Sequence, residues 1–142
     1  GDRFLGAHIG DGVVGYLKHG ELKVVSAPDN DEFANQTTFV TSRRAAESMR
    51  LFRGSLAGVD GFILMSDGTG ESLFNARSGQ LAGACAKLIM AVGAAPAGLS
   101  KTSEYRKRLR RLMDLKIRNA TKDDCSIGIL GRNLPDVSKG IA

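Results

Sequence analysis

Residues Gly61 to Leu73 read GFILMSDGTGESL, a pattern that suggests a strand, a tight turn and the start of a helix in succession. Phe62 to Met65 form an uninterrupted apolar run, which is typical of a strand buried on both faces of a sheet. Asp67 follows this run, and Glu71 brings a second carboxylate four residues later. Two acidic side chains at one strand end suggest a site for a hard cation.

The composition is that of a single globular domain. The chain has 142 residues, enough to bury about two-thirds of the surface that the extended chain would expose. Its longest apolar stretch, residues 81–97, is interrupted by Lys87, Gly93 and Pro96 and is too short to span a bilayer. No secretory signal precedes the first expected strand. We therefore expect a cytoplasmic protein with no membrane partner.

The cysteines and the net charge restrict the other classes of function. Cys85 and Cys125 have no CxxC spacing and no neighbouring histidine, so we expect core thiols and no zinc site. The net charge of +5 comes largely from one segment, residues 106–111. We interpret this segment as the solvated face of an amphipathic helix, and we expect no nucleic-acid partner because no recognition motif accompanies it.

The hydrophobic pattern predicts several antiparallel strands. Short strands are expected at residues 3–9, 48–56 and 125–130. Residues 13–18 and 21–26 are expected to form a hairpin around His19 and Gly20.

Two helices are expected in the second half of the chain. Residues 81–93 have apolar side chains at helical spacing, and a second helix follows the N-cap residues 100–103. The buried stripe of the second helix is expected to consist of Tyr105, Leu109, Leu112 and Met113. The segments without such a pattern are expected to be an exposed loop at 28–36, a short strand at 39–42 and a flexible tail at 133–142.

Further carboxylates stand at expected strand ends. Asp11 follows the first strand, and Asp123 and Asp124 precede the last. If these strands are neighbours, their acids converge with Asp67 and Glu71 on one rim of the sheet. Oxygen ligands of this kind suit magnesium or manganese better than zinc. The alternative is that these residues only form turns and helix caps.

Three motifs, in this order, resemble those of the metal-dependent protein phosphatases of the type 2C family. They are Gly10-Asp11-Gly12, Ser66-Asp67-Gly68 with Glu71, and Lys122 to Ile127. The resemblance covers nearly the whole chain, from Phe4 to Leu130. It implies an α+β fold in which an antiparallel β-sandwich is flanked by helices. It also implies hydrolysis of phosphoserine or phosphothreonine in proteins by a water that a pair of Mg2+ or Mn2+ ions activates.

The resemblance also implies roles for particular residues. The ligands of the central pair of ions would be Asp67 and Asp123, and a third ion would be approached by Asp11 and Glu71. The residues expected to surround these ligands are Gly68, Asp124, His8 and Ser126. For His8 the alternative is a core or rim histidine, and for Ser126 it is hydrogen-bonded support of the loop that carries Asp123.

The sequence departs from the family pattern in two of its motifs and lacks one half of the pattern. Glu71 and the Gly10 to Val13 motif differ from the usual residues, and the N-terminal half, with its phosphate-binding arginine and DGxGG aspartate, has no counterpart. We therefore expect residues 1–132 to be the C-terminal part of a phosphatase-like domain. The sheet edges would be completed by the missing N-terminal half or by a second copy of the chain.

Two functions follow from this incompleteness. The first is a metal-dependent serine/threonine phosphatase of which this chain supplies the C-terminal part. The alternative is a catalytically incomplete module that binds a phosphoprotein or a regulatory partner. In the first case the basic residues 106–111 are also suited to steering acidic phosphorylated substrates.

Overall fold

The computed structural model describes residues 2–28, 40–41, 43, 45–95 and 104–133. Most of the predicted loop at 28–36 and strand at 39–42 lies outside these residues, as does the predicted tail from residue 134 onward. Val40 and Thr41 form a turn. None of the helices in the described ranges is long and apolar enough to cross a membrane.

The central sheet has four antiparallel strands in the order β3-β2-β5-β8. Their bounds are β2 Val13–Lys18, β3 Glu21–Ser26, β5 Val59–Met65 and β8 Ile127–Gly131. The predicted hairpin is confirmed, because Lys18 pairs with Glu21 across a turn in which His19 and Gly20 have φ angles of 51° and 79°. The apolar run of the sequence therefore lies in β5, between β2 and β8.

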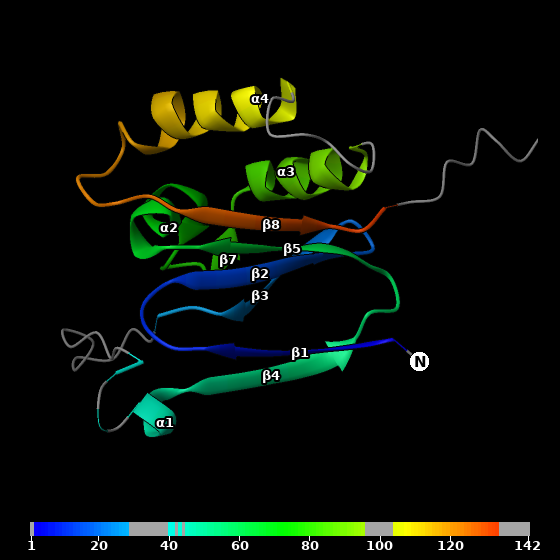
Figure 1. Cartoon of the computed structure of the whole chain (residues 1–142), viewed down its shortest axis with the longest axis vertical. Helices are drawn as coiled ribbons and strands as arrows, with labels where there is room; N and C mark the ends of the chain where they lie inside the picture. Colours follow the sequence, from blue (N-terminus) through cyan, green and yellow to red (C-terminus); the bar gives the residue numbers. More distant parts are fainter. Residues whose placement is uncertain (1, 29–39, 42, 44, 96–103, 134–142) are drawn as a thin grey trace, which may run out of the picture.

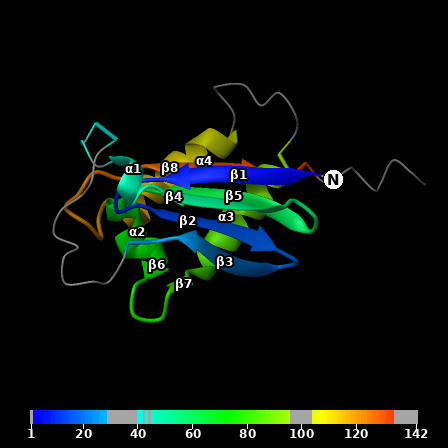
Figure 2. The same cartoon turned by 90° about the horizontal axis from the view of Figure 1, so that it is seen from below.

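A second sheet packs on one face of the first. It consists of β1 (Arg3–His8) and β4 (Arg50–Ser55), which pair antiparallel. The short helix α1 (Ala45–Ser48) directly precedes β4 in the chain. Phe4 meets Phe62 of β5 edge to face at a centroid distance of 5.0 Å, and Tyr16 lies 6.0 Å from Phe62. Figures 1 and 2 show the two sheets face to face, so the predicted α+β fold with an antiparallel sandwich is confirmed.

Helices cover the other face of the central sheet (Figure 1). Short α2 (Asp67–Leu73) follows β5, the small hairpin of β6 (Phe74–Asn75) and β7 (Gln80–Leu81) comes next, and α3 (Gly83–Gly93) packs on β5 and β8. Beyond α3, α4 (Glu104–Leu112) continues into a π-helical turn, η1 (Met113–Ile117). The buried core lies between these helices and the sheet and comprises Val13, Leu17, Ile63, Met65, Leu73, Cys85, Ile89 and Ile117.

Several predicted positions are wrong in detail. Leu64 is 43% exposed, so β5 is not buried on both faces, because the second sheet covers Phe62 through Phe4 without burying Leu64. Leu81 belongs to β7 and not to the following helix. Cys125 precedes β8 and is partly exposed, whereas Cys85 is buried as predicted.

The second helix also differs from its prediction. Tyr105 is 38% exposed, and no residue of α4 is fully buried. The buried anchor of this segment is Ile117, at the end of η1. Leu109, Leu112 and Met113 are half-buried, as the predicted stripe requires, so the prediction is wrong for Tyr105 and lacks Ile117.

Candidate metal-binding site

Three of the predicted acidic residues lie at one end of the central sheet. Val13, Met65 and Ile127 form one cross-strand row, since Met65 pairs with both Val13 and Ile127. Asp11 stands two residues before this row, Asp67 two residues after it and Asp123 four residues before it. The antiparallel register therefore directs three separate chain segments to the same rim.

Four hydrogen bonds hold two of these segments together. The Ser66 N–H donates to Ser126 O at 3.1 Å, and the Ser126 N–H donates to Ser66 Oγ at 3.0 Å. The Ser66 hydroxyl donates to Asp124 O at 3.2 Å, and the Thr69 hydroxyl donates to Ser126 O at 2.9 Å. Because Ser66 uses its hydroxyl in this way, the chain end of β5 is fixed against the loop that carries Asp123.

Gly68 permits the close approach of these segments. A Cβ atom at Gly68 would lie 2.6 Å from Asp124 O and 3.1 Å from Asp123 Cβ. The first distance is too short for any side chain, so a residue other than glycine would push the two segments apart. Gly68 is thus required by the contact between α2 and the Asp123 loop, while its predicted place around bound ions stays a prediction.

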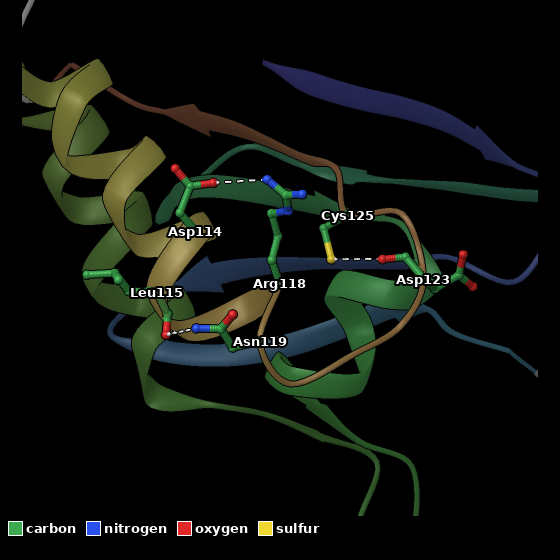
Figure 3. A network of polar contacts seen from close by, with 6 residues as sticks. All are labelled: Asp114, Leu115, Arg118, Asn119, Asp123 and Cys125. Carbon is green, nitrogen blue, oxygen red and sulfur yellow. Dashed lines mark hydrogen bonds and ion pairs between the residues drawn. The ribbon is translucent and has the colours of Figure 1, made fainter.

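The carboxylates of Asp67 and Asp123 have similar surroundings. Both residues are exposed, and each accepts a hydrogen bond through Oδ1 from the N–H of the next residue, at 2.9 Å for Asp67 and 2.8 Å for Asp123. Neither has a cationic partner among the described residues. Figure 3 shows the Asp123 carboxylate pointing away from Cys125, whose Sγ lies 3.5 Å from the Asp123 backbone oxygen.

Asp11 lies in a turn that is anchored from the second sheet. Arg50 of β4 donates hydrogen bonds to Gly10 O, at 2.8 Å, and to Ala27 O. The Arg50 guanidinium thus joins the turn before β2 to the chain after β3. This anchor could not be found from local sequence, because Arg50 is 40 residues from Gly10.

His8 is at the same end of the molecule but is bound to β3. Its Nδ1 lies 2.7 Å from Ser26 Oγ. Burial and then the Arg50 guanidinium lower the pKa of His8 from its ordinary value of 6.5, while Asp11 acts in the opposite direction. A neutral imidazole is therefore favoured, which fits the interpretation of His8 as a rim histidine.

The predicted residues line two different clefts. One, of about 410 Å³, is lined by His8, Leu64, Ser66 and Ser126 among others. The other, of about 660 Å³, lies between α2 and the β6–β7 hairpin and is lined by Glu71. Glu71 thus borders a different cleft from the one beside Ser66 and Ser126.

The residues at the rim fit part of a cation site. Asp67 and Asp123 offer hard oxygen donors on segments that are hydrogen-bonded to each other. Among the residues that the structure describes, however, no three His, Cys, Asp or Glu side chains form a group that could hold a metal ion. Asp11, Asp67, Glu71 and Asp123 all fall within these residues, so they do not form a complete ligand set by themselves.

The sequence interpretation missed one supporting residue, Thr69. Thr69 was expected to be a turn or cap residue, yet it is fully buried and its hydroxyl ties α2 to Ser126. Ser126 itself supports the Asp123 loop, as the alternative interpretation proposed, through its backbone N–H and C=O. The available signal was the pair of hydroxyl residues flanking Asp67 and Gly68.

Solved structures with a similar fold are bacterial serine phosphatases. One crystal structure shares 19% sequence identity, with a TM-score of 0.56, over 95% of this chain and 55% of that chain. A variant with an arginine replaced by lysine shares 17% identity with a TM-score of 0.58, over 95% of this chain and 55% of that one. A variant with a glutamate replacement shares 20% identity with a TM-score of 0.56, over 92% and 48%. At these identities the likeness establishes the fold.

The chain spans about half the length of these phosphatase structures. No curated protein matches its sequence. The sequence does match the family described as Protein phosphatase 2C over residues 1–113. Since this match covers most of the 142 residues and the sandwich has the same fold as the serine phosphatases, the chain belongs to the protein phosphatase 2C family.

Proposed function

We propose that this chain supplies the C-terminal part of a metal-dependent protein serine/threonine phosphatase. The observation that carries the proposal is the pairing of the Asp67 and Asp123 segments at one rim through Ser66 and Ser126. Both carboxylates are exposed and lack a cationic partner among the described residues, so their oxygen atoms are accessible to a metal ion. Their oxygen donors suit Mn2+ or Mg2+.

In this proposal Asp67 and Asp123 hold the central ions, and Asp11 and Glu71 approach a third. When bound, a pair of such ions neutralises the phosphate charge and makes a water molecule nucleophilic at neutral pH. The chain's own contribution is to fix the ligands. Ser66 and Thr69 hold the Asp123 loop in place, and Gly68 allows it to approach α2.

The missing ligands would come from a further part of the fold. The described residues hold no group of three potential ligands, and the chain spans about half the length of the phosphatase structures. Strand β8 is an edge strand, and Leu130 on it is 63% exposed. We propose that an N-terminal phosphatase segment pairs along β8 and completes the sandwich and the site.

Size-exclusion chromatography with light scattering measures whether a second copy of the chain, instead of an N-terminal segment, pairs along β8. A second copy in its place would appear as a dimer of the isolated chain. A stable lone monomer that binds manganese tightly and hydrolyses phosphopeptides would contradict the need for any completing segment.

The phosphatase proposal is tested by manganese-stimulated release of phosphate from a phosphoserine peptide. We expect release by the chain together with its completing segment, and loss of release in Asp67→Asn. The exposed residue Asp114, which pairs with Arg118 at 3.5 Å on the helix side, provides the control variant Asp114→Asn. Equal release by wild type and Asp67→Asn would refute the assignment of Asp67.

The second candidate function is a phosphatase-like module that binds a phosphoprotein without turnover. It is favoured by the absence of a three-ligand group among the described residues. Manganese binding with no phosphate release, even with a completing segment present, would support this function over the first.

A further inference from the structure

The exposed side of α4 carries a concentrated positive charge. Five of its nine residues are arginine or lysine, and all five are exposed. We call these residues the basic face: Arg106, Lys107, Arg108, Arg110 and Arg111. At 100° per residue they occupy one side of the helix, and the half-buried Leu109 and Leu112 lie on the other.

Three of these five charges have no counter-charge among the described residues. Arg108 pairs with Glu104, the one acidic residue of α4, at 3.7 Å, and both side chains are largely exposed. Lys107, Arg110 and Arg111 have no ion-pair partner among the described residues. Lys107 also stands three and four residues before the two arginines, a spacing at which like charges repel on a helix. The basic face thus weakens the helix that bears it.

Stabilisation of a helix end does not explain these arginines. Cations favour a helix C-terminus because they face its free carbonyl groups. Here α4 does not end at Leu112 but continues through η1 to Ile117, where Arg118 N–H still donates to Met113 O. Arg110 and Arg111 therefore lie in the middle of one helical segment.

The basic face leads toward the candidate site. In Figure 1, α4 is the outermost element on the helical side and runs toward the end of the molecule that holds α2. The chain then passes through η1, whose Ile117 is buried, to the loop that carries Asp123, as Figure 3 shows. A substrate bound at the rim could therefore extend along α4 without crossing the sheets.

From this arrangement we infer that the basic face binds an acidic segment of the phosphoprotein substrate, away from the phosphorylated residue. The inference rests on the proposed phosphatase function. Arginine pairs with carboxylates through two parallel hydrogen bonds, so clustered glutamates and aspartates are suitable partners. The basic face would raise the local concentration of such substrates and select among them.

A protein segment fits the basic face better than a nucleic acid does. Tyr105 is the one aromatic residue of α4, and it lies on the side of Leu109 and Leu112, so no ring is present on the basic face to stack on a base. The basic residues span five intervals along the helix, or about 8 Å. This length matches a few acidic side chains of a peptide.

The test measures binding by fluorescence anisotropy. The probe is a labelled peptide with a phosphoserine and a run of glutamates, and its counterpart has glutamines in their place. We expect the glutamate peptide to bind at least about threefold more tightly at low salt, with the difference lost at high salt. Arg110→Gln with Arg111→Gln should abolish the difference.

The matched control also removes two positive charges, but from a different surface of the molecule. Arg3→Gln with Arg53→Gln removes two exposed arginines from the second sheet, on the other side of the central sheet from α4 (Figure 1), and should preserve the difference. Circular dichroism would confirm that both double variants keep the wild-type fold. Equal binding of the two peptides by wild type, or the same loss in both double variants, would overturn the inference.

Two further outcomes separate this inference from the proposed function. Suppose that the glutamate peptide binds through α4 but no phosphate is released with the completing segment present. This outcome would support peptide binding by the basic face and refute the proposed phosphatase function. Phosphate release from both peptides at equal rates and equal affinities would support the phosphatase function and refute peptide binding by the basic face. Tighter α4-dependent binding of single-stranded DNA than of the glutamate peptide would overturn the inference in favour of a nucleic-acid surface.

Discussion

The Ser66 hydroxyl donates a hydrogen bond to the Asp124 carbonyl oxygen at 3.2 Å, although the two residues are 58 positions apart. Ser66 is the N-cap residue of α2, where a serine hydroxyl commonly caps the helix, but this hydroxyl makes no capping hydrogen bond. The side chain is used instead to hold the Asp123 loop against the end of β5. The hydroxyl of Ser66 therefore connects two chain segments and does not cap the helix.

We expect Ser66→Ala to loosen the contact between the end of β5 and the Asp123 loop. The variant loses the hydrogen bonds to Asp124 O and from the Ser126 N–H, which should lower the free energy of unfolding by about 1 kcal/mol. Urea denaturation measures this loss, and manganese titration should show weaker binding. The control is Ser55→Ala, whose Oγ accepts one hydrogen bond from the Ala57 N–H in a remote turn. Unchanged manganese affinity in Ser66→Ala would argue against a role for this serine in positioning.

Gly68→Ala should be more harmful. The new methyl group would lie 2.6 Å from Asp124 O, which belongs to backbone and cannot turn aside. We expect a loss of about 1 to 3 kcal/mol in the free energy of unfolding, together with weaker manganese binding. Gly83→Ala provides the control, because a Cβ at Gly83 meets no atom within 4 Å and should leave both quantities nearly unchanged. Wild-type stability of Gly68→Ala would show that the loop can move away at no cost.

The sequence predicted the fold best where local pattern and tertiary pairing agree. The His19–Gly20 turn determines the register of the first hairpin, and the apolar run before Asp67 predicts the central strand, β5. The exposure of Leu64 could not be predicted, because it depends on how far the β1–β4 sheet extends over β5. The same holds for Leu81, whose helical spacing with Cys85 is outweighed by its pairing with Phe74.

The candidate site was predictable only in part. Strand-end position brought Asp11, Asp67 and Asp123 to one rim, since an antiparallel register carries such residues together. The contacts that fix them, such as Arg50 with Gly10 and Thr69 with Ser126, join segments 40 and 57 residues apart. The local periodicity of a sequence does not predict contacts between residues so far apart in the chain.

Removing one carboxylate charge tests the ligands directly. We expect Asp67→Asn and Asp123→Asn each to weaken manganese binding by at least about tenfold, because an amide oxygen lacks the full negative charge that a hard cation favours. Isothermal titration of the chain with its completing segment measures this affinity. Asp114→Asn, which removes an exposed carboxylate paired with Arg118, serves as the control. If one variant retains wild-type affinity, that residue is not a ligand.

The two cysteines should differ in reactivity. Burial raises the pKa of Cys85 to about 11, so near pH 8 only about one thiol in a thousand is ionised, and the side chain is also inaccessible. Cys125 is partly exposed beside the Asp123 loop. We expect iodoacetamide to modify Cys125 in the native chain and Cys85 only after denaturation. Mass spectrometry of the peptides identifies the site, and Cys125→Ser should remove the native labelling.

His8 should make the fold less stable in mild acid. Its pKa in the folded chain lies below the ordinary value of 6.5, because burial and the Arg50 guanidinium oppose protonation more than Asp11 favours it. The unfolded chain therefore binds the proton more readily than the folded chain does. The contribution of His8 to stability is complete well above pH 6.5 and is lost as the pH falls through 6.5 toward the folded pKa.

Urea denaturation between about pH 5 and 7.5 measures this loss, since exposed carboxylates titrate mostly below that range. The free energy of unfolding of wild type should fall toward the acid end, and His8→Gln should fall less because no proton binds at that position. His19→Asn is the matched control, since it leaves His8 with Ser26 and asparagine tolerates the positive φ of 51° at the turn. A steeper acid loss in His8→Gln than in wild type would mean that protonated His8 stabilises the fold, with the attraction of Asp11 outweighing burial and the Arg50 guanidinium.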